Sequence, residues 1–221
     1  MQYLRLLIEQ YYDMQNYRIS MANRLRAAKE ASTEEEYAVL EVHYKEFEQL
    51  EKSIKRDITR AVNAHPMWKA YLKDVKGIGS IFAGALLSTI DIEKADHASS
   101  VWKYCGLAVN PETGEGDKRV RGEKISWNPF LKKTCFLIGK SFVKTKGTYR
   151  GVYDTSKAFY QVKFPEEVKI PKTKIKKYTK GHIDAMARRR TVKLFLAEFW
   201  AEWRALNDLP VSEPFAHRII K

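Results

Sequence analysis

Cysteine is scarce in this chain, since only Cys105 and Cys135 occur among its 221 residues. Two cysteines cannot form the disulfide framework of a small secreted protein, and with five scattered histidines they match no zinc motif. Both lie in apolar stretches of sequence, so we expect buried free thiols. We therefore expect no metal site and no cofactor.

Long apolar segments are also missing. No run reaches the roughly 18 apolar residues that identify a transmembrane helix, and the N-terminus lacks the apolar core of a signal peptide. The sequence therefore predicts a protein of the reducing cytoplasm with no membrane partner. Hydrophobic residues still make up 44% of the chain, which is enough for a packed core in one or two domains.

Acidic residues are outnumbered by basic ones, 27 to 40, and the formal net charge is +13. The excess lies after residue 64: residues 1–64 hold 10 basic and 11 acidic side chains, whereas residues 65–221 hold 30 and 16. A basic body of this kind favours a polyanionic partner such as nucleic acid, with the neutral N-terminal part as an assembly element. No segment shows the converging carboxylates of a two-metal phosphodiesterase, so we expect no nuclease chemistry.

The first 64 residues predict two long helices. Their apolar positions are Leu7, Tyr11, Met14, Met21, Leu25 and Ala28, then Tyr37, Leu40, Tyr44, Phe47, Ile54 and Ile58. Ser32 or Thr33 is the expected N-cap of the second helix, because glutamates follow in its first turn. We predict a coiled-coil hairpin that dimerises into a four-helix bundle, since two helices alone bury little surface. The alternative is that the hairpin packs on its own basic domain.

Residues 65–221 predict a compact basic domain, also helical, so that the whole chain is expected to be all-α. The boundary is at His65-Pro66, because proline disfavours a helical conformation in the residue before it. We expect helices over residues 67–75, 80–89, 129–144 and 182–207, one around 152–162, and a short one ending at Cys105 with Ser99 or Ser100 as its cap. The glycine-rich residues 106–125 favour a loop or short hairpin, and the Trp and Phe stripe of the last helix favours a core.

A helix-hairpin-helix is predicted by L-K-D-V-K-G-I-G-S-I-F-A-G-A-L-L, which starts at Leu72. Gly77 and Gly79 would form the hairpin, because so tight a turn needs positive φ and close backbone approach. The amides that follow would open a helix whose N-terminus can bind a phosphate. The candidate contacts here are Lys76, Gly77, Gly79 and Ser80.

Two further basic clusters predict contacts to a nucleic-acid backbone, because guanidinium and ammonium groups match phosphate. The loop at 111–125 and the start of the next helix supply Lys118, Arg119, Arg121, Lys124, Lys132 and Lys133. The lysine run and the last helix supply Lys172, Lys174, Lys176, Lys177, Lys180, His182, Arg188, Arg189, Arg190 and Lys193. The alternatives are a solvated loop for the first cluster, and a capping or core hydrogen bond for His182. Tyr149, Tyr153 and Tyr160 lie among basic residues and are candidates for base stacking.

From Leu72 to Lys133 the pattern resembles the C-terminal domain of the bridge-RNA-guided insertion-sequence transposases, the Piv-type DEDD recombinases. The matching motifs are G-I-G with A-G-A-L-L, then C-G-L, P-x-T-G and R-G-x-K-I-S, and H-I-D-A-M-A-R-R-R-T-V-K-L-F-L is similar to C-terminal segments found near that family. In the family a nuclease-like domain with four acids precedes this region, and a catalytic serine precedes the loop glycine. Here the four acids are absent and Thr113 stands before Gly114, so Thr113 is the one weak catalytic candidate and we expect no enzyme.

A helical hairpin followed by a basic helical domain is also similar to the Nop domain of box C/D ribonucleoproteins. The chain resembles the Nop-domain Tas proteins of tandem-interspaced guide RNA systems in their nuclease-free form. This resemblance implies a homodimeric ribonucleoprotein core of the prokaryotic cytoplasm or nucleoid, with a guide RNA and a target DNA as partners. Two alternatives remain: a transposase-derived or recombinase-derived protein that acts on DNA, with or without strand transfer, and a sequence-neutral factor that binds duplex DNA through the hairpin motif.

Overall fold

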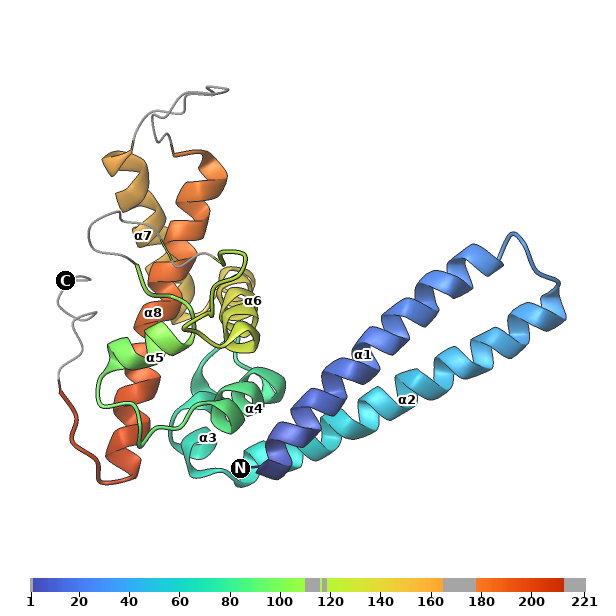
Figure 1. Cartoon of the computed structure of the whole chain (residues 1–221), viewed down its shortest axis with the longest axis horizontal. Helices are drawn as coiled ribbons and strands as arrows, with labels where there is room; N and C mark the ends of the chain where they lie inside the picture. The colour runs from blue at the N-terminus through green and yellow to red at the C-terminus, as the bar shows by residue number, and fades with distance from the viewer. Residues whose placement is uncertain (1, 110–115, 117–118, 165–177, 213–221) are drawn as a thin grey trace. The chain divides into compact units, whose positions relative to one another are not determined.

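The computed structural model describes residues 2–109, 116, 119–164 and 178–212, and every regular element in these ranges is a helix (Figure 1). The elements are α1 (Gln2–Ala28), α2 (Glu34–Ala64), α3 (Pro66–Ala70), the 3-10 helix η1 (Leu72–Asp74), α4 (Ser80–Thr89), α5 (Ala98–Tyr104), α6 (Pro129–Thr145), α7 (Thr148–Lys163) and α8 (Lys180–Leu206). The predicted all-α class is confirmed. None of the described helices is long and apolar enough to cross a membrane.

The chain divides into two compact units. The first consists of residues 1–65 together with 80–89, and the second of residues 66–79 together with 90–221. Helix α4 therefore packs in the first unit, although the segments before and after it belong to the second.

In the first unit α1 and α2 run antiparallel, side by side, and are joined by residues 29–33 (Figure 1). Thr33 is the N-cap of α2: its Oγ1 accepts a hydrogen bond from the Glu36 amide at 3.3 Å. The Glu36 carboxylate accepts one from the Thr33 amide at 3.0 Å, which completes a capping box. The cap fixes where the second helix of the hairpin begins.

The core of the first unit lies where α4 packs against both long helices. Gly84 of α4 lies so close to Ile8 that an added Cβ would be 2.9 Å from its Cδ1, and Ile8 and Ile58 are fully buried. Away from α4, seam residues such as Met14 and Leu40 are only half-buried. The hairpin by itself therefore leaves much of its apolar seam in contact with water.

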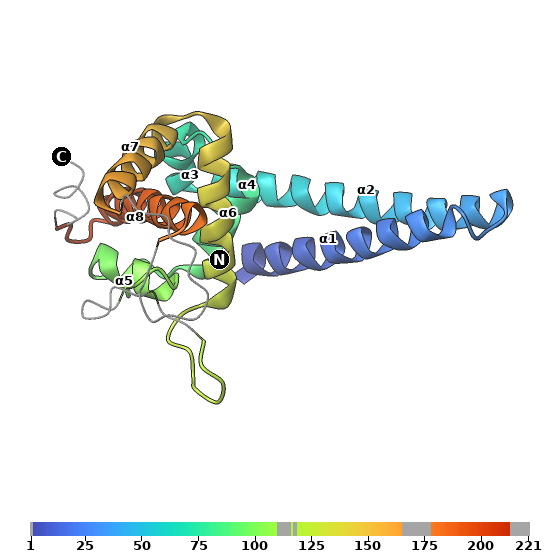
Figure 2. The same cartoon turned by 90° about the horizontal axis from the view of Figure 1, so that it is seen from above.

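In the second unit α8 is the central helix and contacts α3, α5, α6 and α7. Figure 2 shows α8 with α7 on one side and α5 on the other. Phe195, Phe199 and Trp200 have no exposed surface, and the Trp200 Nε1 donates a hydrogen bond of 2.6 Å to the Ala95 carbonyl. The predicted apolar stripe is therefore core. Cys105 is a buried free thiol, as expected, and so is Cys135.

Two local predictions were wrong. The expected helix over residues 67–75 is split into α3 and η1, because Tyr71 takes a non-helical backbone conformation with φ −141°. That conformation accompanies a hydrogen bond of 2.5 Å between the Tyr71 and Tyr149 hydroxyls. The N-cap of α5 is His97 and not a serine, and it makes no side-chain capping bond.

The predicted hairpin glycines differ from each other. Gly77 has φ +103°, and an added Cβ would lie 2.9 Å from Thr145 Oγ1, whereas Gly79 does not have a positive φ and has open space around it. Gly77 is also held by Ser141, whose hydroxyl donates to its carbonyl oxygen at 2.7 Å. The expectation of positive φ is confirmed for Gly77 and wrong for Gly79.

Alanine substitution should therefore separate the two glycines. We expect Gly77→Ala to lower the free energy of unfolding by at least about 1–2 kcal/mol, because an alanine at positive φ is strained and would also clash. Gly79→Ala serves as the matched control and should change it by no more than about 0.5 kcal/mol. Tryptophan fluorescence during chemical denaturation measures both, because all five tryptophans lie in the second unit. Equal losses for the two variants would contradict the assignment.

Candidate nucleic-acid interface

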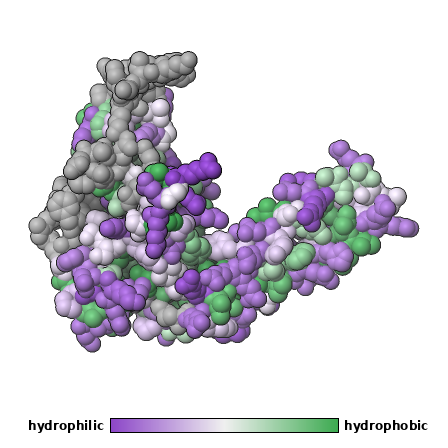
Figure 3. All heavy atoms as spheres, viewed as in Figure 1, coloured by the Kyte–Doolittle hydropathy of each residue, from purple (hydrophilic) through white to green (hydrophobic). Residues whose placement is uncertain are grey.

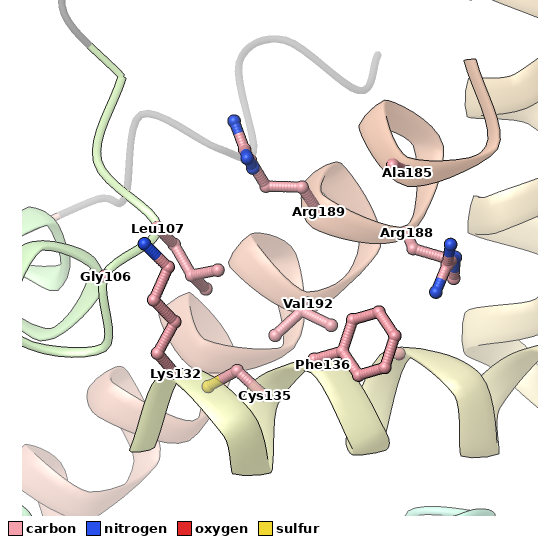
Figure 4. Close-up of a pocket in the computed structure, with 10 residues that line it drawn as sticks. Gly106, Leu107, Lys132, Cys135, Phe136, Ala185, Arg188, Arg189 and Val192 are labelled. Atoms are coloured by element: carbon pink, nitrogen blue, oxygen red, sulfur yellow. The ribbon is translucent and has the colours of Figure 1, made fainter. Parts of the chain in front are cut away.

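A cavity of about 150 Å³ lies in the second unit between residues 106–107, α6 and α8 (Figure 4). We call it the α6–α8 pocket. Leu107, Cys135 and Val192 form apolar parts of its wall. Its remaining lining residues are Gly106, Lys132, Phe136, Gly139, Ala185, Arg188 and Arg189. The pocket thus combines an apolar interior with three cationic side chains that the sequence places in two separate clusters.

The start of α6 positions Lys132 and Phe136 on one face. The Asn128 Oδ1 accepts hydrogen bonds from the amides of Phe130 and Leu131 at 2.9 and 3.1 Å, and Pro129 occupies the first helical position. Lys132 and Phe136 are four residues apart and therefore adjacent on that helix. The predicted helix start at Asn128-Pro129 is confirmed, and it determines which α6 residues line the pocket.

Gly106, the glycine of the C-G-L motif, allows the chain that follows α5 to line the α6–α8 pocket. Gly106 has φ +66°, and an added Cβ would lie 2.8 Å from Lys132 Cδ and 3.0 Å from Trp127 Cδ1. The Lys132 Nζ in turn lies 4.2 Å from the centre of the Trp127 ring. Only a residue without a side chain fits between these groups, so Gly106 lets Leu107 contribute to the wall.

The guanidinium of Arg189 lies against Gly116 of the glycine-rich loop. An added Cβ at Gly116 would lie 2.7 Å from Arg189 Nη1, and Gly116 forms an isolated bridge with Val109. Figure 4 shows the Lys132 and Arg189 side chains pointing to the same side of the pocket. The structure therefore places the guanidinium of Arg189, on the last helix, against Gly116 of the loop.

Arg188 is held in place by its neighbours. Its guanidinium pairs with Asp184 at 2.6 Å and lies 5.2 Å from the centre of the Phe136 ring. Burial raises the pKa of Asp184, but the hydrogen bond from Tyr153 and the charge of Arg188 outweigh it, so this pKa lies below its ordinary value. The Arg188 Nε is buried and has no hydrogen-bond partner among the residues described. One donor of this arginine thus remains unused.

Lys193 lies one turn beyond Arg189 on α8. Its Nζ is 4.9 Å from the centre of the Trp102 ring, and Trp102 Nε1 donates to the Lys193 carbonyl at 2.9 Å. Burial, and then the nearby charge of Arg189, lower the pKa of Lys193 below its ordinary value. Two cations that repel each other in this way would both be stabilised by a phosphate. Arg190 lies elsewhere, 5.0 Å from the ring centre of Phe159 on α7.

The other predicted contact residues do not gather in the pocket. Arg119, Arg121, Lys124 and Lys133 are exposed, as are Lys76, Gly79, Lys180 and His182. Thr113, Lys118, Lys172, Lys174, Lys176 and Lys177 lie outside the described residues. Ser80 belongs to the first unit, where its hydroxyl shares a 2.8 Å hydrogen bond with that of Thr59. The His182 amide donates to Thr179 Oγ1, the N-cap of α8, at 3.2 Å.

Two of the three tyrosines that were predicted to stack on bases are buried, whereas Tyr160 is partly exposed. Tyr149 and Tyr153 are buried, because their rings form part of the packing between α7 and α8. Tyr149 also donates to Glu198, as does Tyr71 at 3.2 Å, which forms a three-residue network that the sequence analysis missed. The sequence contained a signal for this network, because Glu198 interrupts an otherwise apolar stripe on α8.

That network does not resemble the site of an activated tyrosine nucleophile. Burial, followed by the neighbouring Tyr71 and Glu198, raises the pKa of Tyr149, and burial raises that of Tyr71. Raised values keep both hydroxyls protonated and donating, whereas an attacking phenolate needs the opposite shift. The described residues also contain no group of three or more His, Cys, Asp and Glu side chains that could hold a metal ion.

Residues 69–154 match the Transposase IS116/IS110/IS902 family. The match begins in α3, includes all of α4, α5 and α6, and ends within α7, so it contains Gly77, the C-G-L glycine and the α6 side of the pocket. No curated protein matches the chain. The part of the chain that carries the glycine-rich motifs is therefore similar in sequence to a domain of these transposases.

Proposed function

We propose that the second unit binds a nucleic-acid backbone through the basic surface around the α6–α8 pocket. The observation that carries this proposal is the convergence of Lys132, Arg188 and Arg189 on one cavity, with Lys193 one helical turn away. Cations from two helices meet there, in the part of the chain that holds the whole excess of positive charge. Contacts to backbone phosphates do not depend on the identity of the bases. Such a surface therefore supplies affinity but does not select a sequence.

In this proposal the ligand is a guide RNA, and the chain forms the core of a ribonucleoprotein. Base pairing between that RNA and a target DNA would supply the specificity, while the protein recognises shape and backbone. Aromatic rings beside the cations favour RNA with unpaired segments: Trp127 lies beside Lys132, Trp102 beside Lys193, and Phe136 beside Arg188.

The same proposal includes a homodimer formed by the helical hairpin. Its support is the exposure of large apolar side chains on α1 and α2, namely Tyr3, Leu6, Tyr17, Ile19, Val39, Val42 and Leu50. Figure 3 shows hydrophobic residues among the hydrophilic ones on the visible face of these helices. A second hairpin would cover such residues, together with the half-buried seam, in a four-helix bundle.

The test is to express the chain with the DNA that flanks its gene, purify it and sequence the nucleic acid that accompanies it. We expect one discrete small RNA encoded beside the gene, because a guide must be supplied by the same locus. Light scattering on this sample should give a protein mass of two chains of 25.7 kDa. Heterogeneous RNA, or none, would contradict the guide-RNA proposal, and a monomeric mass would contradict the dimer.

A second candidate function is favoured by the family match. A protein derived from the IS116/IS110/IS902 transposases could act on DNA directly, with Thr113 as its one hydroxyl candidate for residual strand transfer. The purification experiment distinguishes the two functions. If the purified protein carries no discrete RNA but binds duplex DNA tightly, the result would favour the transposase-derived function. The same result would be expected of a sequence-neutral DNA-binding factor.

A further inference from the structure

We propose that the α6–α8 pocket receives the base of an unpaired nucleotide, while the cations around it hold the phosphates of the same strand. This inference rests on the proposed nucleic-acid binding and names the part of the ligand that enters the protein. Base capture would give a surface made for phosphates a way to distinguish single strands from duplexes.

The size and lining of the pocket suit a base. At about 150 Å³ the cavity is well below the roughly 300–1,000 Å³ of pockets for drug-sized ligands. Leu107, Cys135 and Val192 offer apolar surface to the faces of a ring, and no carboxylate lines the cavity. A single flat aromatic ring is the component of a nucleic acid that fits such a space.

Phe136 supplies a stacking surface at the pocket. Its side chain lines the cavity, yet 52% of the residue is exposed, which is high for a phenylalanine in a packed helical unit. The Arg188 Cζ and the Lys140 Nζ lie over this ring, 5.2 and 4.9 Å from its centre. An exposed aromatic ring beside cations is the arrangement by which proteins stack an unpaired base next to its phosphates.

The positive charges around the pocket favour a ligand that carries negative charge, such as a nucleic-acid strand, over an uncharged apolar ligand. Lys132 and Arg189 reach the pocket from different elements and point to the same side (Figure 4). Arg188 also lines the cavity, and its guanidinium is held by Asp184 at 2.6 Å. A nucleotide brings a phosphate attached to its base, which a neutral apolar ligand does not.

Two oligonucleotides of equal length test the inference with the full chain. One is an oligouridylate of about 12 nucleotides, and the other is its abasic counterpart, which keeps every phosphate but no base. We expect the wild-type protein to bind the base-bearing strand about tenfold more tightly. Phe136→Ala should remove this preference, leave the affinity for the abasic strand unchanged and leave the salt dependence of binding unchanged.

Phe159→Ala is the matched control, because Phe159 is 48% exposed and lies beside Arg190 and Lys163 but does not line the pocket. It should keep the wild-type preference, and Phe136→Trp should restore it. Equal effects of the two alanine variants, or equal binding of both strands by the wild type, would overturn base capture while leaving backbone binding intact. Failure of the wild type to bind either strand would overturn the proposed function as well.

Discussion

Replacing Lys132, Arg189 and Lys193 together by glutamine is expected to weaken RNA binding by about 100-fold or more at physiological salt. Each substitution removes one charge-assisted contact worth roughly 1 kcal/mol or more, and about 1.4 kcal/mol corresponds to a factor of ten. The slope of log affinity against log salt should fall by about 2 in magnitude, since each lost phosphate contact on a single strand contributes about 0.7. Titrations at several salt concentrations, with the RNA that accompanies the protein, measure both quantities.

The control variant removes the same kind of charge from the other unit. Lys45→Gln with Lys52→Gln changes two lysines of α2 that pair with Glu41 and Glu48 on the same helix. This variant should keep nearly the full affinity and the full salt slope. If both variants lose affinity equally, binding depends on overall charge and not on the surface around the α6–α8 pocket. An unchanged slope in the triple variant would exclude these three side chains as phosphate contacts.

Trp200→Ala is expected to cause the largest loss of stability, about 3–5 kcal/mol in the free energy of unfolding of the second unit. Trp200 is completely buried on the central helix, and its removal leaves a cavity next to the guanidinium of Arg204. The Ala95 carbonyl keeps one donor, because Arg204 Nη1 also reaches it at 3.0 Å, so the cost comes mainly from lost packing. Denaturant unfolding followed by the fluorescence of the remaining tryptophans measures the change.

Two further variants give stability losses with which the loss in Trp200→Ala can be compared. Leu206→Ala lies on the same helix at a residue that is 45% exposed, and should cost no more than about 0.5 kcal/mol. Trp200→Phe keeps an aromatic ring but not the N–H donor, and should cost about 1–2 kcal/mol. A Trp200→Ala protein as stable as the Leu206→Ala protein would show that α8 is not the centre of the folded unit.

Helix positions were well predicted because their signals are local. A capping box at Thr33 and the Asn128-Pro129 pair depend on residues within one turn of each other. The break at Tyr71 could not be foreseen in the same way. It accompanies hydrogen bonds to Tyr149 and Glu198, which are far away in the sequence.

The candidate site was only partly predictable. The sequence identified Lys132, Arg188 and Arg189 as basic residues suited to phosphate, but it treated them as members of two separate clusters. It also favoured Tyr149 and Tyr153 for stacking, whereas they are buried and Phe136 is the ring exposed beside the pocket. Lys132 and Phe136 are four residues apart, a spacing that could have indicated their shared face.

The sequence by itself determined the helical class, the concentration of positive charge after residue 64 and the positive φ of Gly77, because these follow from composition and local backbone conformation. Only the tertiary structure decided what each of three consecutive arginines faces: Arg188 lies by Phe136, Arg189 by Gly116 and Arg190 by Phe159. Successive helical residues point about 100° apart, so long-range packing alone determines which of them reaches the pocket.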